Sequence, residues 1–298
     1  MLNNIAMKEF VGNNPQLASC RQSKTYSDLY VLKYKKRVFF NNLWNDYLEL
    51  CRGTVVDADY NIVSKPFRKI YNYGIENRAP VLDDSVQVDA YVKINGFMGA
   101  ITWYKDDILI STTGSLDSDF VQYVKDHVTD DIVQVCKQHP KLTFMFECVH
   151  KEDPHIIPEE EGLYLLGYNN KQWNCDERID PTQLSQFASL MNCKMPEYVR
   201  TTVGELKQLA KTTKTEGYVA YTDNGEAFKI KSPYYLLKKL LARSNNLSKL
   251  TNPSIKEKMP EEFYPLVDEI QKDPKQFIEM KEQARLTWIR NFLENINA

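Results

Sequence analysis

Three separate segments of the sequence carry a lysine or a carboxylate in a position where it could act on a phosphate. Lys93 follows a valine-rich stretch and precedes Gly96 by three residues. Glu147 stands inside an otherwise apolar segment, and Glu216 opens another. Charged side chains are costly to bury in such segments, so each one suggests a function. Taken singly, each also has an ordinary explanation, either a surface lysine or a structural ion pair.

A second set of candidate residues is basic. Lys229 and Lys231 alternate with apolar residues, so both side chains leave the same face of one expected strand. Arg52 opens an earlier strand, and Lys69 closes a basic segment after it. Separately, these could be solvated surface charges, and lysines on an edge strand also discourage aggregation. All of these features in one chain are a much rarer coincidence than any single one.

Together these residues suit nucleotidyl transfer. A lysine attacks the α-phosphorus of a nucleoside triphosphate only as the neutral amine, and we expect neighbouring cations and a metal to lower the pKa of Lys93. Lys229, Lys231 and a magnesium ion would neutralise charge on the phosphate and on departing pyrophosphate. Glu147 and Glu216 could hold the metal or accept a hydrogen bond from a ribose hydroxyl.

The phosphate-binding element is not a familiar one. Neither a P-loop nor a G-x-G-x-x-G motif occurs, so those two cradles are excluded. Gly96 would instead let the backbone approach the nucleotide closely.

Short strands and turns fill most of the first 240 residues, and helices follow. Segments rich in β-branched and aromatic residues predict strands at residues 54–58, 87–94, 100–104, 108–112, 142–149, 163–168, 218–222 and 227–231. Helical spacing predicts helices at residues 117–138, 180–191, 234–242, 260–272 and 273–295. We therefore expect an α+β fold, with an antiparallel-sheet domain over residues 1–240 and a small all-helical domain over residues 241–298.

The composition is that of a folded protein. The 298 residues are 43% hydrophobic and 26% charged, and no apolar stretch is long enough to span a membrane. No secretory signal is expected at the start, and the six scattered cysteines are typical of free thiols in a reducing cytosol.

The formal charge of −2 is unevenly distributed. Residues 1–80 carry a net +5, residues 81–231 a net −9 and residues 232–298 a net +2. Chance variation along a chain could produce this. The alternative is that basic ends flank a phosphate-bearing ligand while the acidic middle holds a metal.

The candidate residues resemble, in order, the motifs of the RNA ligase 1 family of T-even bacteriophages. That family belongs to the covalent nucleotidyltransferase superfamily of polynucleotide ligases and capping enzymes. The matching segments are 51–54, 64–69, 93–96, 146–147, 216–219 and 228–231. The first two distinguish this family from DNA ligases and cap-forming enzymes, and the resemblance runs from about Tyr26 to Tyr235.

The resemblance implies an ATP-dependent RNA ligase with an ATP-grasp-like ligase domain. Lys93 would take AMP from ATP, AMP would pass to a 5′-phosphate RNA end, and a 3′-hydroxyl end would displace it. The resemblance implies that Lys229 and Lys231 contact the α-phosphate and that Arg52 and Lys69 bind the β- and γ-phosphates. It also implies that Glu147 contacts the ribose and that Glu216 and Glu147 hold the metal. The metal would be Mg2+ or Mn2+. The protein would be a monomer without a membrane partner, in the cytoplasm, and in the host cytoplasm if it is viral.

Some positions depart from the family pattern. Asn95 replaces an acidic residue beside the nucleophile, and residues 111–113 lack the lysines that often precede the following Gly-Ser. His155 could contact phosphate or be an ordinary loop residue, and the segment after about Leu236 shows no match. The aromatic residue expected to stack on adenine could be any of Tyr91, Phe97, Tyr168 and Tyr218.

Three other functions remain open at the level of sequence. One is a DNA ligase or capping guanylyltransferase, although the expected helical tail does not resemble the OB-fold those enzymes usually append. Another is a catalytically inactive relative that binds nucleic acid, and the last is a structural or interaction protein.

Overall fold

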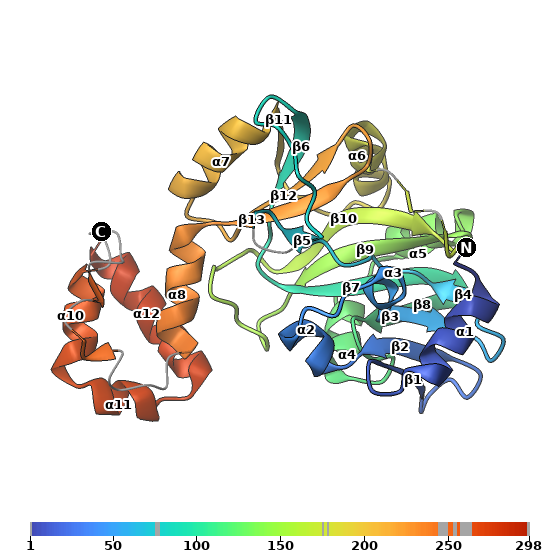
Figure 1. The fold of residues 1–298 in the computed structure, drawn as a ribbon, viewed down its shortest axis with the longest axis horizontal. Helices are drawn as coiled ribbons and strands as arrows, with labels where there is room; N and C mark the ends of the chain where they lie inside the picture. Colours follow the sequence, from blue (N-terminus) through green and yellow to red (C-terminus); the bar gives the residue numbers. More distant parts are fainter. Residues whose placement is uncertain are drawn as a thin grey trace.

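Three sheets and a group of C-terminal helices make up the computed structural model (Figure 1). It describes residues 2–74, 78–174, 176–177, 179–243, 250–252, 255–256 and 264–296. Cys175 and residues 260–263 of an expected helix lie outside these ranges. The expected α+β fold with antiparallel sheets and a small helical C-terminal region is confirmed.

The N-terminal sheet has the strand order β1-β2-β3-β4 and is antiparallel throughout. Its strands are β1 (Ala18–Gln22), β2 (Tyr30–Tyr34), β3 (Arg52–Val56) and β4 (Ile62–Ser64), and its helices are α1 (Asn4–Asn13), α2 (Lys36–Phe40) and α3 (Asp46–Leu50). Trp44, Leu48 and Leu50 are buried in its apolar cluster. This cluster anchors the connection that leads from α3 into β3.

The second sheet has the order β10-β9-β7-β8 and is also antiparallel. Its strands are β7 (Phe97–Tyr104), β8 (Asp107–Thr112), β9 (Leu142–Val149) and β10 (Gly162–Asn170), and its helices are α4 (Asp119–Lys125), α5 (Asp130–Gln138) and α6 (Pro181–Leu190). Phe144 and Phe146 of β9 are fully buried in the largest core of the molecule. This core fixes the strand on which Glu147 lies.

The third sheet has the order β11-β6-β12-β13-β5, with β5 parallel to β13 and the other pairs antiparallel. Its strands are β5 (Tyr71–Asn72), β6 (Gln87–Val92), β11 (Tyr198–Thr202), β12 (Gly217–Thr222) and β13 (Ala227–Lys231), and its helix is α7 (Val203–Thr212). The sheet places Lys93, Glu216 and the β13 lysines beside one another, because β12 pairs with both β6 and β13.

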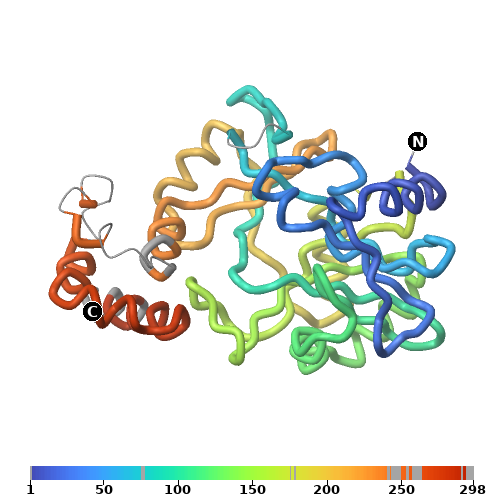
Figure 2. The backbone as a smooth tube through the Cα atoms, turned by 60° about the horizontal axis from the view of Figure 1, so that its bottom comes forward, coloured from blue at the N-terminus to red at the C-terminus, as the bar shows by residue number. Residues whose placement is uncertain are grey.

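The C-terminal helices have an apolar cluster of their own. They are α8 (Pro233–Arg243), α10 (Tyr264–Lys272), α11 (Pro274–Glu279) and α12 (Glu282–Ile296). Leu237 of α8 packs in one cluster with Leu266 and Ile289. Figures 1 and 2 both show these helices at the end of the molecule opposite the N-terminal sheet. The division of the chain at residue 240 stays a prediction.

Two expected helices are each two helices in the structure. The helix expected at 117–138 is interrupted after Lys125, because the side chain of Thr129 accepts a hydrogen bond from the backbone N–H of Ile132 and starts α5. The helix expected at 273–295 is interrupted at Met280, which is extended between α11 and α12.

Candidate active site

Lys93 is at the centre of the site, immediately after β6. Its backbone N–H donates to the carbonyl oxygen of Gly217 at 2.8 Å, which ties it to the start of β12. Its Nζ lies 3.1 Å from Oε2 of Glu216. The candidate nucleophile and the candidate carboxylate from two distant segments are therefore in direct contact.

Glu216 is almost fully buried and is the most heavily bonded side chain of the site. Besides Lys93, it accepts a hydrogen bond from Nδ2 of Asn95 at 2.7 Å and pairs with Nζ of Lys231 at 2.9 Å. Burial disfavours its charged form, but Lys93 and Lys231 outweigh burial and hold the pKa of Glu216 below its usual value. The carboxylate is therefore ionised.

Asn95 connects the Lys93 segment to a neighbouring loop. Its buried side chain donates to Glu216 and accepts from the backbone N–H of Ile157 at 2.9 Å. Its own backbone N–H donates to Glu159 at 3.2 Å. An amide side chain can donate a hydrogen bond through its nitrogen and accept one through its oxygen. An ionised acidic side chain, the kind found at this position in the family that the sequence resembles, can only accept. This gives the departure at this position a structural reason.

Glu147 approaches Lys93 from the second sheet. Its side chain is buried on β9 and accepts a hydrogen bond from the backbone N–H of Gly96 at 3.1 Å. Burial raises the pKa of Glu147, and the charge of Lys93 offsets this only in part.

The prediction that neighbouring groups lower the pKa of Lys93 is wrong for the protein alone. Burial does act in that direction, but Glu147 and Glu216 together outweigh it and raise the pKa of Lys93. The reason is geometric, because Glu216 contacts the Lys93 ammonium directly whereas Lys231 pairs with the other oxygen of the same carboxylate.

Gly96 is required by a close approach within the protein. A Cβ atom at this position would lie 2.3 Å from the carbonyl oxygen of Cys148 and 3.0 Å from Cγ of Glu147. This glycine therefore makes room for the backbone of β9. That Gly96 also lets the backbone approach the nucleotide stays a prediction.

Lys229 stands among other cations. Burial, followed by the charges of Arg52, Lys69, Lys231 and Lys93, lowers the pKa of Lys229 to about 7. Because these neighbouring cations disfavour the charged form of the partly buried Lys229, an anion bound beside it would favour that form.

Lys69 is held on aromatic rings. Its Nζ lies 4.8 Å from the ring centre of Trp44 and 4.1 Å from that of Tyr71. Its backbone N–H donates to the carbonyl oxygen of Glu49 at 3.1 Å. These contacts bring a residue from the N-terminal part of the chain next to the third sheet.

Two adjacent cavities, which share part of their lining, are bordered by Arg52, Lys69, Lys93, Glu147 and Lys229. The inner cavity is bordered at its polar end by Arg52, Lys93, Glu147 and Lys229. Its apolar walls come from Ile94, Met98, Leu166, Pro196 and Val219. Sequence reasoning missed these apolar residues, which carry no signal that separates them from ordinary core positions.

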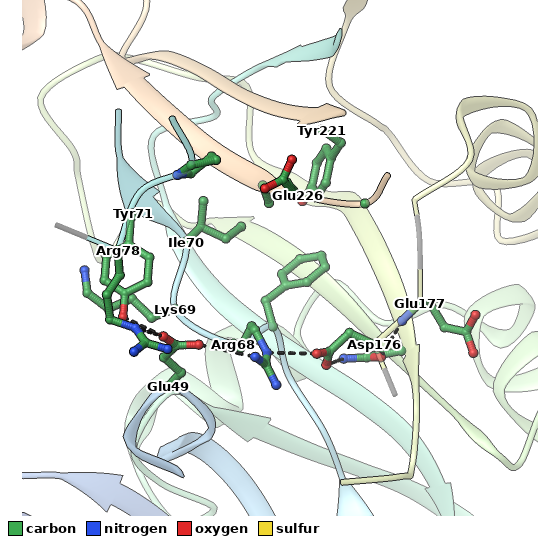
Figure 3. Close-up of a pocket in the computed structure, with 15 residues that line it drawn as sticks. Glu49, Arg68, Lys69, Ile70, Tyr71, Arg78, Asp176, Glu177, Tyr221 and Glu226 are labelled. Atoms are coloured by element: carbon green, nitrogen blue, oxygen red, sulfur yellow. Dashed lines mark hydrogen bonds and ion pairs between the residues drawn. The ribbon is translucent and has the colours of Figure 1, made fainter. Parts of the chain in front are cut away.

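The outer cavity encloses about 480 Å³ and is shown in Figure 3. It shares Phe67, Arg68, Ile70 and Tyr221 with the inner cavity. Buried Glu49 pairs with Nε of Arg78 at 2.7 Å and with Arg68 at 3.3 Å. This ion-pair network on the outer cavity was also missed.

The four aromatic candidates for stacking on adenine have different surroundings in the structure. Tyr91 borders the inner cavity. Phe97 packs against Phe120, Tyr168 packs against Phe187, and Tyr218 belongs to a different apolar cluster.

A third cavity meets Lys93 from the C-terminal side. It encloses about 410 Å³ and is lined by Asn95, Glu216, Tyr235 and residues 153–156 together with Glu282, Gln283 and Leu286 of α12. His155 is among its lining residues, and its Nε2 lies 2.8 Å from Oδ2 of Asp153.

The family is decided by a sequence match over most of the chain. A family model described as RNA ligase matches residues 50–235, a range that includes every predicted site residue from Arg52 to Lys231. The chain belongs to this RNA ligase family. It is thus an enzyme of the nucleotidyltransferase superfamily, and the non-enzymatic alternatives are set aside.

Solved structures with the same fold are also ligases. The RNA ligase is similar to an archaeal ATP-dependent RNA ligase, with 12% identity, a TM-score of 0.58 and coverage of 98% of this chain and 80% of that one. It is also similar to a putative ATP-dependent DNA ligase from Aquifex aeolicus, with 16% identity, a TM-score of 0.56 and coverage of 90% and 73%. At these identities the likeness shows the fold.

The metal predicted at Glu147 and Glu216 has few protein ligands available. Among the residues that the structure describes, no group of three His, Cys, Asp or Glu side chains could hold an ion. Magnesium commonly uses one or two carboxylates together with substrate phosphates, so two glutamates fit it. No helix in the described part of the ligase is long and apolar enough to cross a membrane.

Proposed function

We propose that this RNA ligase uses ATP to join a 5′-phosphate RNA end to a 3′-hydroxyl end through a Lys93–AMP intermediate. The observation that carries the proposal is the group of cations around Lys229, beside Lys93 and at the polar end of the inner cavity. A bound triphosphate would add negative charge to this group, in which Lys93 and Lys231 already pair with Glu216. The apolar walls of the same cavity suit a flat nucleobase.

In the first step, Nζ of Lys93, after losing a proton, forms a bond to the α-phosphorus of ATP. The bond from that phosphorus to the bridging oxygen breaks, and pyrophosphate leaves. Lys229 and Lys231 stabilise charge on the α-phosphate, and Arg52 and Lys69 bind the β- and γ-phosphates. Glu147 binds the ribose.

In the second step, an oxygen of the RNA 5′-phosphate attacks the same phosphorus, and Lys93 leaves as an amine that regains a proton. In the third, the 3′-hydroxyl oxygen attacks the RNA 5′-phosphorus, loses its proton and displaces AMP. A magnesium or manganese ion held by Glu216 and Glu147 would neutralise phosphate charge in these steps.

Residues 241–298 form, in this proposal, a module that selects the RNA. Support comes from the third cavity, where α12 and Lys93 line the same space. The five cysteines that the structure describes are free thiols, which agrees with a cytoplasmic location, in the host cytoplasm if the protein is viral. We propose that the enzyme acts as a monomer in RNA repair.

The decisive experiment is transfer of label from ATP to protein. With α-labelled ATP and magnesium, the wild-type protein should acquire covalent label that stays on the protein in a denaturing gel, and Lys93→Ala should acquire none. The control Lys105→Ala removes an exposed lysine that pairs with Asp28 and should be labelled normally. Absence of label on the wild type, or equal label on Lys93→Ala, would overturn the mechanism.

Substrate choice is tested next. The labelled enzyme should seal 5′-phosphorylated RNA in preference to DNA of the same sequence. Preferential labelling by GTP, or preferential sealing of DNA ends, would favour a capping enzyme or a DNA ligase instead.

A further inference from the structure

Helix α2 and the turn after it expose basic and aromatic side chains together. We call this surface the α2 patch and define it as Lys35, Lys36, Arg37, Phe39, Phe40 and Leu43. Phe39 is 59% exposed and Phe40 76% exposed, both far more than is usual for phenylalanine. The two rings lie 5.8 Å apart at 77°, so each keeps a face open to solvent.

The patch is held in this arrangement by buried residues on both sides. Val38 is fully buried between the exposed side chains, and Trp44 directly after the patch is also buried. These two anchors orient the segment, so the phenylalanines cannot turn inward without displacing core residues. The exposure of the rings is therefore set by the fold.

The patch is also purely cationic. No aspartate or glutamate occurs between Asp28 and Asp46, whereas the chain as a whole has a net charge of −2. Within the described part of the chain, no ion pair involves Lys35, Lys36 or Arg37. Exposed cations beside exposed aromatic rings favour a ligand that carries both phosphates and flat bases.

The patch is connected to the proposed catalytic centre. Trp44 follows it in the chain, and its ring supports the ammonium of Lys69 at 4.8 Å. Lys69 in turn borders the outer cavity, which adjoins the inner cavity that contains Lys93. Figure 1 shows α2 on the side of the N-terminal sheet that is nearer to the C-terminal helices. A strand bound on the patch would therefore have a short path to the site.

We propose that the α2 patch binds single-stranded RNA next to the end that is to be joined. Bases stack on Phe39 and Phe40, and Lys36 and Arg37 contact the phosphates between them. Stacking on an aromatic side chain accepts any base, so the patch adds affinity without sequence preference. This inference rests on the proposed function, because it assigns part of the RNA strand whose end reacts at Lys93.

The test compares RNA affinity with label transfer. Fluorescence anisotropy with a 5′-phosphorylated RNA of about twelve nucleotides, within the usual range of single-strand sites, measures binding. The double variant Phe39→Ala/Phe40→Ala should bind this RNA about tenfold more weakly or worse. Its Lys93 label from ATP should be unchanged, which also shows that it is folded. The control Val81→Ala/Leu190→Ala removes two exposed apolar side chains elsewhere and should bind RNA normally.

The outcomes separate the two proposals. Absence of Lys93 label on the wild type would overturn the proposed function. Normal label with unchanged RNA affinity in the Phe39→Ala/Phe40→Ala variant would overturn the α2 inference alone. The α2 inference would also be overturned if that variant kept its RNA affinity but lost binding to anionic phospholipid vesicles, because the patch would then bind a membrane. Loss of self-association in sedimentation with unchanged RNA affinity would overturn it as well, because the patch would then bind a second copy of the protein.

Discussion

Lys93 and Lys229 have opposite pKa shifts although they belong to one site. Carboxylates face Lys93 and raise its pKa, whereas burial and surrounding cations lower the pKa of Lys229 to about 7. Lys229 is therefore the lysine whose charge changes near neutral pH. A bound triphosphate would restore that charge, because it places negative groups among the cations.

Nucleotide binding should take up a proton at Lys229. Above pH 7 this lysine is mainly neutral in the free protein and would be charged in the complex, so the free energy needed to protonate it reduces the binding affinity. ATP affinity should fall as pH rises, approaching tenfold per pH unit between about 7.5 and 8.5. Below its pKa the lysine is already charged and this contribution is constant. Calorimetry in buffers of different ionisation enthalpy measures both the affinity and the proton uptake.

Lys229→Arg is the matched variant, because a guanidinium stays charged throughout this pH range. Its ATP affinity should lose the decline above pH 7. If wild type and Lys229→Arg show the same pH dependence, the titrating group is a different one.

The hairpin of β12 and β13 carries Lys229 and Lys231 of the proposed site, and Gly217 permits the close pairing of its two strands. Gly217 has φ of 127°, and a Cβ there would lie 2.1 Å from the carbonyl oxygen of Ile230. Gly217→Ala should lower the free energy of unfolding by about 3 kcal/mol, since strain and a backbone clash act together. It should also weaken ATP binding, because Lys229 and Lys231 lie on the displaced strand. Thermal denaturation and ATP titration measure the two effects.

Gly225→Ala is the control in the turn of the same hairpin. Gly225 has φ of 82°, but a Cβ there would meet nothing within 4 Å. Strain alone should cost about 1 kcal/mol, with ATP binding retained. Equal losses in the two variants would mean that the contact with β13 is unimportant.

Elements with a strong local signal were predictable from the sequence. The expected strands at 142–149 and 227–231 match β9 and β13, and Asp180 caps α6 at the start of the helix expected at 180–191. Helix α7 was missed although Thr202 and Glu205 form a capping box, a recognisable sequence signal. The short strands β4 and β5 depend on pairing with distant strands, which local sequence does not encode.

The candidate site was predictable where a charge stands out against an apolar strand. Lys93, Glu147 and Glu216 are of this kind, and the structure brings them together. The role of Asn95 depends on its contact with Ile157, a residue more than sixty positions away. Which charges face Lys93 likewise depends on side-chain geometry, and this is why carboxylates determine the direction of its pKa shift in the protein alone.

At the scale of the whole molecule, an excess of positive charge lies in the part of the chain that supplies several of the proposed contacts to ATP and RNA. The net +5 of residues 1–80 includes the α2 patch, Arg52 and Lys69, while residues 81–231 carry a net −9. The acidic remainder should repel RNA away from these positions. The protein therefore suits recognition of an RNA end and the few nucleotides next to it.

This charge distribution predicts a modest dependence of RNA binding on salt. Each phosphate contact on a single strand contributes about −0.7 to the slope of log K against log salt concentration. With about three contacts from Lys35, Lys36 and Arg37 of the α2 patch, the wild-type slope should be about −2. Lys36→Ala/Arg37→Ala should reduce its magnitude by about 1.4, because two of those contacts are removed.

Lys105→Ala, which removes an exposed lysine outside the patch, should leave the slope unchanged. Anisotropy titrations at several salt concentrations give these values, and a slope steeper than about −6 would instead indicate a long electrostatic footprint along the RNA.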